Sequence, residues 1–147
     1  MSIDKLIDAV IERNNPTVLG LDPRLSYIPP HITEAAREKN PEPFAAAAAA
    51  VLAFNRGLID ALCDIVPAVK PQSACYEQFR YEGVKAYYDT IAYAKSRGMY
   101  VIADVKRSDI GSTCECYASA HIGMVDLFGQ HLPVFDAGGG LVHEQGV

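Results

Sequence analysis

The chain has 147 residues, of which 50% are hydrophobic and 21% are charged, and its formal net charge is −5 at pH 7. This composition is typical of one folded domain with a sizeable core, and the acidic balance argues against nucleic acid or an anionic membrane as the main partner. No uninterrupted apolar run reaches about 18 residues, and charges interrupt the N-terminal apolar pattern, so we expect neither a membrane span nor a signal peptide.

The first part of the chain predicts a helix, a buried strand and a long connection. Apolar residues spaced three and four apart between Ile3 and Ile11 mark one face of a helix. Residues 17–21 form a short apolar run that delivers Asp22 at its end, as a buried parallel strand would. Prolines punctuate the connection that follows, in which residues 33–39 favour a short helix.

The middle of the chain predicts a long helix followed by a second strand. Residues 44–63 include six consecutive alanines, and alanine is the strongest helix former. The second apolar run, residues 65–69, leads to Lys70. Because Pro71 follows, Lys70 is pushed towards extended geometry and belongs at the end of the strand.

The remaining elements continue the same alternation. Apolar spacing over residues 84–91 predicts a helix, and residues 99–103 predict a third strand. A helix is expected from about residue 109 to residue 128, and residues 132–135 form a weak fourth extended segment. Strands that alternate with helices predict an α/β fold with a parallel sheet, whose chemistry lies at the C-terminal ends of the strands.

Charged residues follow each of the three clear strands, namely Asp22, Lys70, and Asp104 with Lys106, and Asp109 comes shortly after the last pair. An unpaired buried charge is costly, so we expect these lysines and aspartates to pair. Neighbouring carboxylates hold a lysine in its protonated form, and such a lysine can donate a proton and stabilise a developing carbanion. The alternative is a salt-bridge network with a purely structural role at the mouth of a barrel.

The cysteines carry no sign of a metal site. Their spacing lacks the paired pattern of zinc ligands, so reduced cytosolic thiols are the expectation and no metal is predicted. The four cysteines are Cys63, Cys75, Cys114 and Cys116.

Several segments together resemble one enzyme family. Residues 101–113, VIADVKRSDIGST, closely resemble the signature of orotidine 5′-monophosphate decarboxylase. GLDPRL at 20–25, FNRGLIDAL at 54–62 and VPAVKPQSACYEQF at 66–79 are similar to further parts of that family, most closely its longer-chain bacterial branch. The resemblance implies a (β/α)8 barrel, of which residues 1–137 are the N-terminal part, about the first half, and residues 138–147 an atypical tail.

The resemblance also implies the reaction and the residues that perform it. The family decarboxylates orotidine 5′-monophosphate to UMP in de novo pyrimidine biosynthesis, without metal or organic cofactor, as a cytoplasmic homodimer. By motif, Lys106 protonates C6 of the pyrimidine as carbon dioxide leaves, and Asp104 lies beside the departing carboxylate. Lys70 and Asp109 complete an alternating charge array, with Asp109 supplied across the dimer interface.

The same carry-over by motif implies the residues that bind the substrate. Asp22 and Lys70 contact the ribose hydroxyls, and Ile110 and Thr113 line the pocket from the partner subunit.

The chain departs from the family after residue 137, where a fourth strand and four further strand–helix units would follow. A half-barrel leaves two open sheet edges, so we expect a fragment or truncated product whose residues alone show no decarboxylation. Two other hypotheses stay open: a non-catalytic truncated half-barrel that only dimerises, and a relative that decarboxylates sugar phosphates and usually needs a metal.

Overall fold

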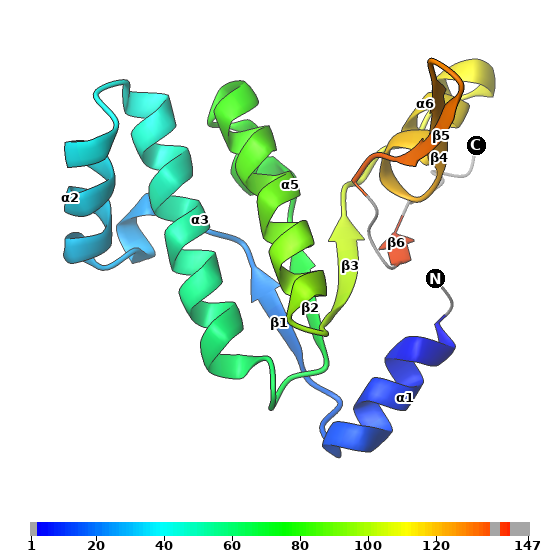
Figure 1. Cartoon of the computed structure of the whole chain (residues 1–147), viewed down its shortest axis with the longest axis horizontal. Helices are drawn as coiled ribbons and strands as arrows, with labels where there is room; N and C mark the ends of the chain where they lie inside the picture. The colour runs from blue at the N-terminus through cyan, green and yellow to red at the C-terminus, as the bar shows by residue number, and fades with distance from the viewer. Residues whose placement is uncertain (1–2, 136–138, 142–147) are drawn as a thin grey trace.

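Four parallel strands form the sheet of the computed structural model, which describes residues 3–135 and 139–141 (Figure 1). Their order is β1-β2-β3-β6, and the outer strands of the described sheet are therefore β1 and β6. The strands are β1 (Val18–Leu21), β2 (Ala68–Pro71), β3 (Tyr100–Asp104) and β6 (Gly139–Leu141).

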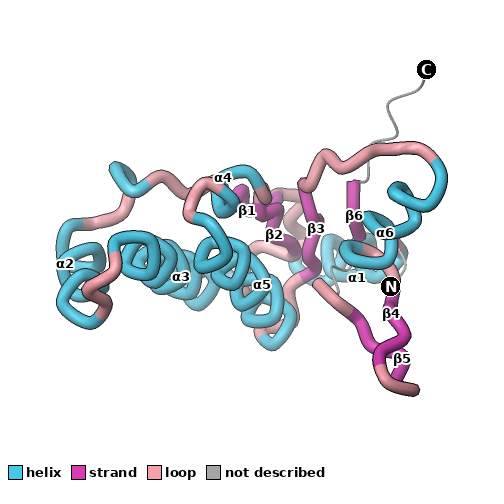
Figure 2. The backbone as a smooth tube through the Cα atoms, turned by 90° about the horizontal axis from the view of Figure 1, so that it is seen from above, coloured by secondary structure: helices cyan, strands magenta, loops and turns pink. Residues whose placement is uncertain are grey.

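Helices cover one face of this sheet and one of its ends. Seen from above, α3 and α5 lie side by side on the same face, and α1 lies at the N-terminal end of the strands (Figures 1 and 2). The helical elements are α1 (Asp4–Arg13), the short 3-10 helix η1 (Leu25–Tyr27), α2 (Pro30–Lys39), α3 (Pro43–Leu62), α4 (Ala74–Glu77), α5 (Arg80–Ser96) and α6 (Gly111–His121).

The two faces of the sheet differ because side chains alternate along a strand. Odd-numbered residues such as Leu21, Val69 and Val101 are buried in the hydrophobic core shared with the helices. The register pairs Gly20 with Lys70, so even-numbered residues project from the opposite face. The predicted charged residues of the strands, which are even-numbered, therefore gather on the face that the helices leave open.

The long alanine-rich helix forms as its sequence predicts, and local signals define its start. Pro43 occupies the first turn, where its missing N–H costs nothing, and the Glu42 side chain accepts a hydrogen bond from the Ala45 amide at 2.7 Å. Within the described ranges, α3 is the one helix long and apolar enough to cross a membrane, by length and composition only. Core helices meet the same criterion, and α3 buries Val51 and Ile59 in the core.

The sequence prediction is wrong for the region after α6. The helix expected to reach residue 128 ends at His121, and β4 (Met124–Leu127) pairs with β5 (Gln130–Pro133) as an antiparallel hairpin. Two residues with positive φ, Phe128 at 52° and Gly129 at 82°, form the tight turn that suits such a hairpin. Of the fourth extended segment expected at residues 132–135, residues 132 and 133 thus belong to the hairpin, and residues 134 and 135 follow its last strand.

The fourth parallel strand comes from the segment expected to be a tail. Backbone pairing joins Ile102 to Gly139 and Asp104 to Leu141 in parallel register. The other tail residues, 138 and 142–147, and the last two of the predicted barrel segment, 136 and 137, lie outside the described residues.

Replacing Gly83 by alanine is expected to destabilise the fold by about 1–3 kcal/mol, because overpacking forces backbone to move. A Cβ at Gly83 would lie 1.9 Å from the Tyr76 carbonyl oxygen and 2.8 Å from the Phe79 Cβ, where α4 approaches α5. Gly57 in α3 is the matched control, since a Cβ there meets no atom within 4 Å. Gly57→Ala should stabilise by about 0.5–1 kcal/mol. Urea unfolding of both variants tests the contrast, and equal effects would contradict the close approach.

Candidate active site

The charged residues at the strand ends meet in one cluster centred on Asp104. Lys70 Nζ lies 3.3 Å from Asp22 Oδ1 and 3.3 Å from Asp104 Oδ2, so it bridges the ends of β1 and β3. Lys106 Nζ pairs with the other oxygen, Asp104 Oδ1. The predicted pairing of Asp22, Lys70, Asp104 and Lys106 is therefore present in the structure.

Asp104 is held as a carboxylate by its two lysine partners. Its side chain is 14% exposed, compared with 30% for Lys70 and 66% for Lys106. Burial raises the pKa of Asp104, but hydrogen bonds from Lys106 and Lys70 and their positive charges outweigh it, so the pKa is lowered from its ordinary value. The negatively charged Asp104 carboxylate thus lies between the ammonium groups of Lys70 and Lys106.

The backbone turns sharply directly after β3. Lys106 has a φ of 45°, in the left-handed region that non-glycine residues rarely adopt. Arg107 supports this turn, because its Nη1 donates to the Val105 carbonyl oxygen at 3.0 Å and its Nη2 pairs with Glu77 of α4. The turn lets Lys106 reach back to Asp104 instead of continuing along the strand direction.

The other predicted residues lie outside this cluster. Asp109 Oδ1 accepts a hydrogen bond from the Ile110 amide at 2.8 Å, and no ion pair joins Asp109 to either lysine within the described ranges. Ile110 is 81% exposed, and Thr113, in the first turn of α6, is exposed as well. One copy of the chain therefore presents these three residues to solvent, outside the cluster of its own lysines.

Gln72 belongs to the cluster and was not predicted as a site residue. Its Nε2 donates to Asp104 Oδ2 at 2.8 Å, and its backbone forms a parallel bridge with Asp104. The signal was present in the sequence, because Gln72 follows Lys70 by two positions and an extended chain places both on one face.

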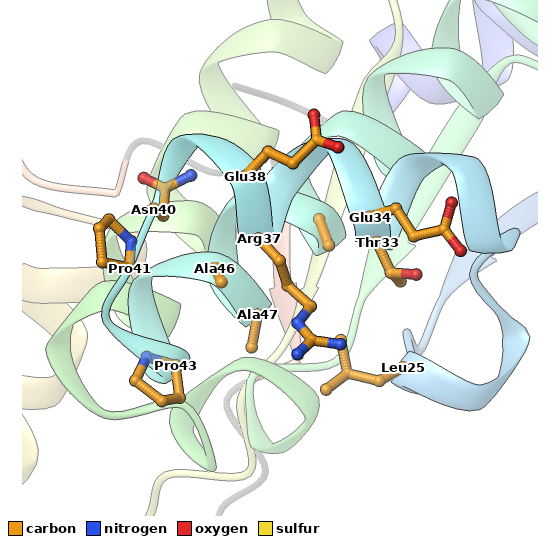
Figure 3. A pocket seen from close by; sticks show the side chains of 11 residues that line it. Leu25, Thr33, Glu34, Arg37, Glu38, Asn40, Pro41, Pro43, Ala46 and Ala47 are labelled. Atoms are coloured by element: carbon orange, nitrogen blue, oxygen red, sulfur yellow. The ribbon is translucent and has the colours of Figure 1, made fainter.

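A separate groove of ≈ 880 Å³ lies between α2 and α3 and contains none of the predicted residues (Figure 3). Arg37 extends along it towards Leu25, and Ala46 and Ala47 lie beneath (Figure 3). In the part of the chain that the structure describes, no three His, Cys, Asp or Glu side chains are grouped to hold a metal ion. The four cysteines are unpaired.

Parallel strands that carry paired charges at their C-terminal ends, with helices on one face, match the arrangement of part of a (β/α)8 barrel. Residues 46–129 match the model of the "Orotidine 5'-phosphate decarboxylase / HUMPS family". The chain belongs to this family.

Individual relatives agree with the family match. The chain is 38% identical over 118 residues to an orotidine 5′-phosphate decarboxylase of Rhodopirellula baltica, and 44% identical over 119 residues to one of Clostridium novyi. These matches cover 80% and 81% of this chain but 38% of each relative. The structure of Leishmania donovani OMP decarboxylase is similar with a TM-score of 0.60 and 25% identity, covering 92% of this chain and 42% of that one. The chain therefore spans about two fifths of the length of its relatives.

Proposed function

We propose that this chain carries the charged half of the active site of an orotidine 5′-monophosphate decarboxylase, which forms UMP and carbon dioxide. The single observation that carries the proposal is the Asp104 carboxylate held between Lys70 and Lys106 at the C-terminal edge of the sheet. In the reaction, the bond from C6 to the carboxylate breaks and its electron pair stays on C6. Lys106 then gives a proton to C6 and becomes a neutral amine.

The electrostatics of the cluster suit this chemistry. An ammonium group fixed in advance beside C6 stabilises the carbanion as it forms, and exclusion of water strengthens that interaction. Asp104 lies beside the substrate carboxylate and holds the Lys106 side chain by their ion pair until the carboxylate has left. All charges in this scheme come from side chains, so neither a metal nor an organic cofactor is part of the proposal.

The ribose and the partner subunit complete the site in this proposal. Asp22 and Lys70 hold the ribose hydroxyls, which the exposure of Asp22 permits. Asp109, Ile110 and Thr113 act in the site of a second subunit within a cytoplasmic homodimer. Their exposure and the lack of an ion pair between Asp109 and the lysines of its own described chain support this assignment.

Binding of UMP, together with mass in solution, distinguishes the enzyme from a half-barrel that only dimerises. We expect a chimera that joins this segment to the remaining length of the Rhodopirellula baltica relative to be a dimer and to bind UMP in a calorimetric titration. The isolated chain should show no heat of UMP binding, because it spans 38% of that relative. A chimera that dimerises without binding UMP would favour the non-catalytic alternative.

A further inference from the structure

A buried series of hydrogen bonds runs from α3 to the end of β1, the strand that leads to Asp22. Asn55 Nδ2 donates to Tyr76 Oη at 2.9 Å, and Tyr76 Oη donates to the Leu21 carbonyl oxygen at 3.3 Å. Asn55 is 1% exposed, and Tyr76 is 0% exposed. These hydrogen bonds thus link the helix layer to Leu21, the residue that immediately precedes Asp22.

The donor and acceptor in each of these hydrogen bonds follow from the groups that take part. Asn55 Nδ2 also donates to Thr90 Oγ1 at 3.2 Å, and Thr90 Oγ1 donates its own proton to the Ala86 carbonyl at 2.7 Å. Tyr76 Oη accepts from Asn55, so its single proton is free for Leu21. Burial raises the pKa of Tyr76, which keeps the hydroxyl protonated and able to donate.

The Leu21 carbonyl oxygen connects these buried hydrogen bonds to the charged cluster. It accepts a second hydrogen bond from the Gln72 amide at 3.2 Å, and the Gln72 side chain in turn holds Asp104. One carbonyl oxygen therefore joins the strand end that carries Asp22 to the residue that supports Asp104. A shift of this carbonyl would move both carboxylates relative to Lys70.

The network also has a feature that packing alone does not explain. Asn55 Oδ1 is buried and has no hydrogen-bond partner among the described residues. Leaving a buried acceptor unpaired destabilises a fold, and an apolar side chain of similar size would avoid that cost. An apolar residue, however, could not donate the two hydrogen bonds that Asn55 gives to Tyr76 and Thr90.

We infer that Tyr76, oriented by Asn55, is a positioning residue that fixes the strand ends carrying Asp22 and Gln72 and thereby the geometry of the Asp104 cluster. The inference extends the proposed function, since it concerns the same site. This role belongs to the Tyr76 hydroxyl alone. The Tyr76 ring packs against the Tyr87 ring whether or not the hydroxyl is present.

The structure supplies a matched control for removing this hydroxyl. Tyr87 is 2% exposed and its ring lies 5.2 Å from that of Tyr76, but its own Oη has no partner among the described residues. Tyr76→Phe and Tyr87→Phe therefore remove the same atom from neighbouring buried rings. One of these atoms is bonded to the site and the other is not.

The test is amide hydrogen exchange of the full 147-residue chain, followed by NMR, with the Asp104 carboxyl titration as a second readout. We expect Tyr76→Phe to speed exchange at the Gln72 amide about fivefold, the ratio that matches one hydrogen bond of net strength about 1 kcal/mol, and to raise the Asp104 midpoint. Asn55→Leu should give a smaller change of the same kind, and Tyr87→Phe should leave both readouts unchanged.

Two results would overturn the inference: uniform acceleration throughout the core in Tyr76→Phe, or equal effects of Tyr76→Phe and Tyr87→Phe. Either would show that Tyr76 contributes only to stability. If Tyr76→Phe does not fold, Asn55→Leu decides the matter with the same two readouts. None of these measurements requires turnover, so loss of the proposed function would appear separately, as failure of the wild-type chimera to bind UMP.

Discussion

Lys106→Ala is expected to lower kcat/KM for orotidine 5′-monophosphate by about 10⁴-fold or more in the chimera that completes the barrel. In the proposed mechanism the substitution removes both the proton donor and the positive charge beside the developing carbanion, and each contribution is typically worth at least about 10²-fold. Affinity for UMP should change little, because the variant keeps Asp22 and Lys70, the residues proposed to hold the ribose. The absorbance of the orotate ring reports turnover, and a calorimetric titration reports binding.

Two companion variants sharpen this test of Lys106. Lys85→Ala is the control, since Lys85 is an exposed lysine on α5 whose partner is Asp89 at 2.6 Å, and it should leave turnover unchanged. Lys106→Arg keeps the positive charge but holds its proton too tightly to release it, so it should recover little of the rate. Turnover retained in Lys106→Ala would remove Lys106 from the role of proton donor.

Lys70→Met is expected to disrupt the cluster itself, and this effect can be measured in the isolated chain. The variant removes the side chain that bridges Asp22 and Asp104 and leaves the largely buried Asp104 with one lysine. The expected loss of stability at neutral pH is about 1.5–3 kcal/mol, the range typical of a lost hydrogen bond to a charged group, because Lys106 and Gln72 still pair with Asp104. The pKa of Asp104 should rise in this variant, because hydrogen bonding and positive charge from Lys70 help to lower it in the wild type.

The pH dependence of stability follows from the direction of that shift. In the wild type the folded pKa of Asp104 lies below its ordinary value of 3.8, so its contribution to stability is complete above that pH and is lost as the pH falls through the folded pKa. In Lys70→Met the loss should begin at a higher pH. Acid unfolding followed by circular dichroism measures the midpoint, with Lys85→Met as the control, and an unchanged midpoint would show that Lys70 does not hold Asp104.

The three strands and their charged ends were predictable from local signals. Each strand is a short apolar run bounded by a polar residue, and Pro71 restricts Lys70 to extended backbone. Because parallel strands bring their C-terminal ends to one edge, residues far apart in sequence had to meet there. The pairing of Lys70 with Asp22 and Asp104 confirms that expectation.

The region after α6 was not predictable for a physical reason. The apolar residues between 122 and 128 fit either a helix face or an extended strand, and short apolar runs do not distinguish the two. Phe128 adopts positive φ, which an aromatic residue rarely does, so the hairpin turn lacked its usual sequence signal. The left-handed backbone at Lys106 could not be predicted for the same reason, because lysine rarely adopts positive φ.

Turnover of orotidine 5′-monophosphate by the completed barrel shows whether the strand-end cluster of this chain is a decarboxylase site. Substrate is added to the wild-type chimera while the absorbance of the orotate ring is followed, with Lys106→Ala measured in parallel. We expect a fall in absorbance with release of carbon dioxide in the wild type and none in the variant. A folded, UMP-binding chimera that leaves the absorbance unchanged would contradict it.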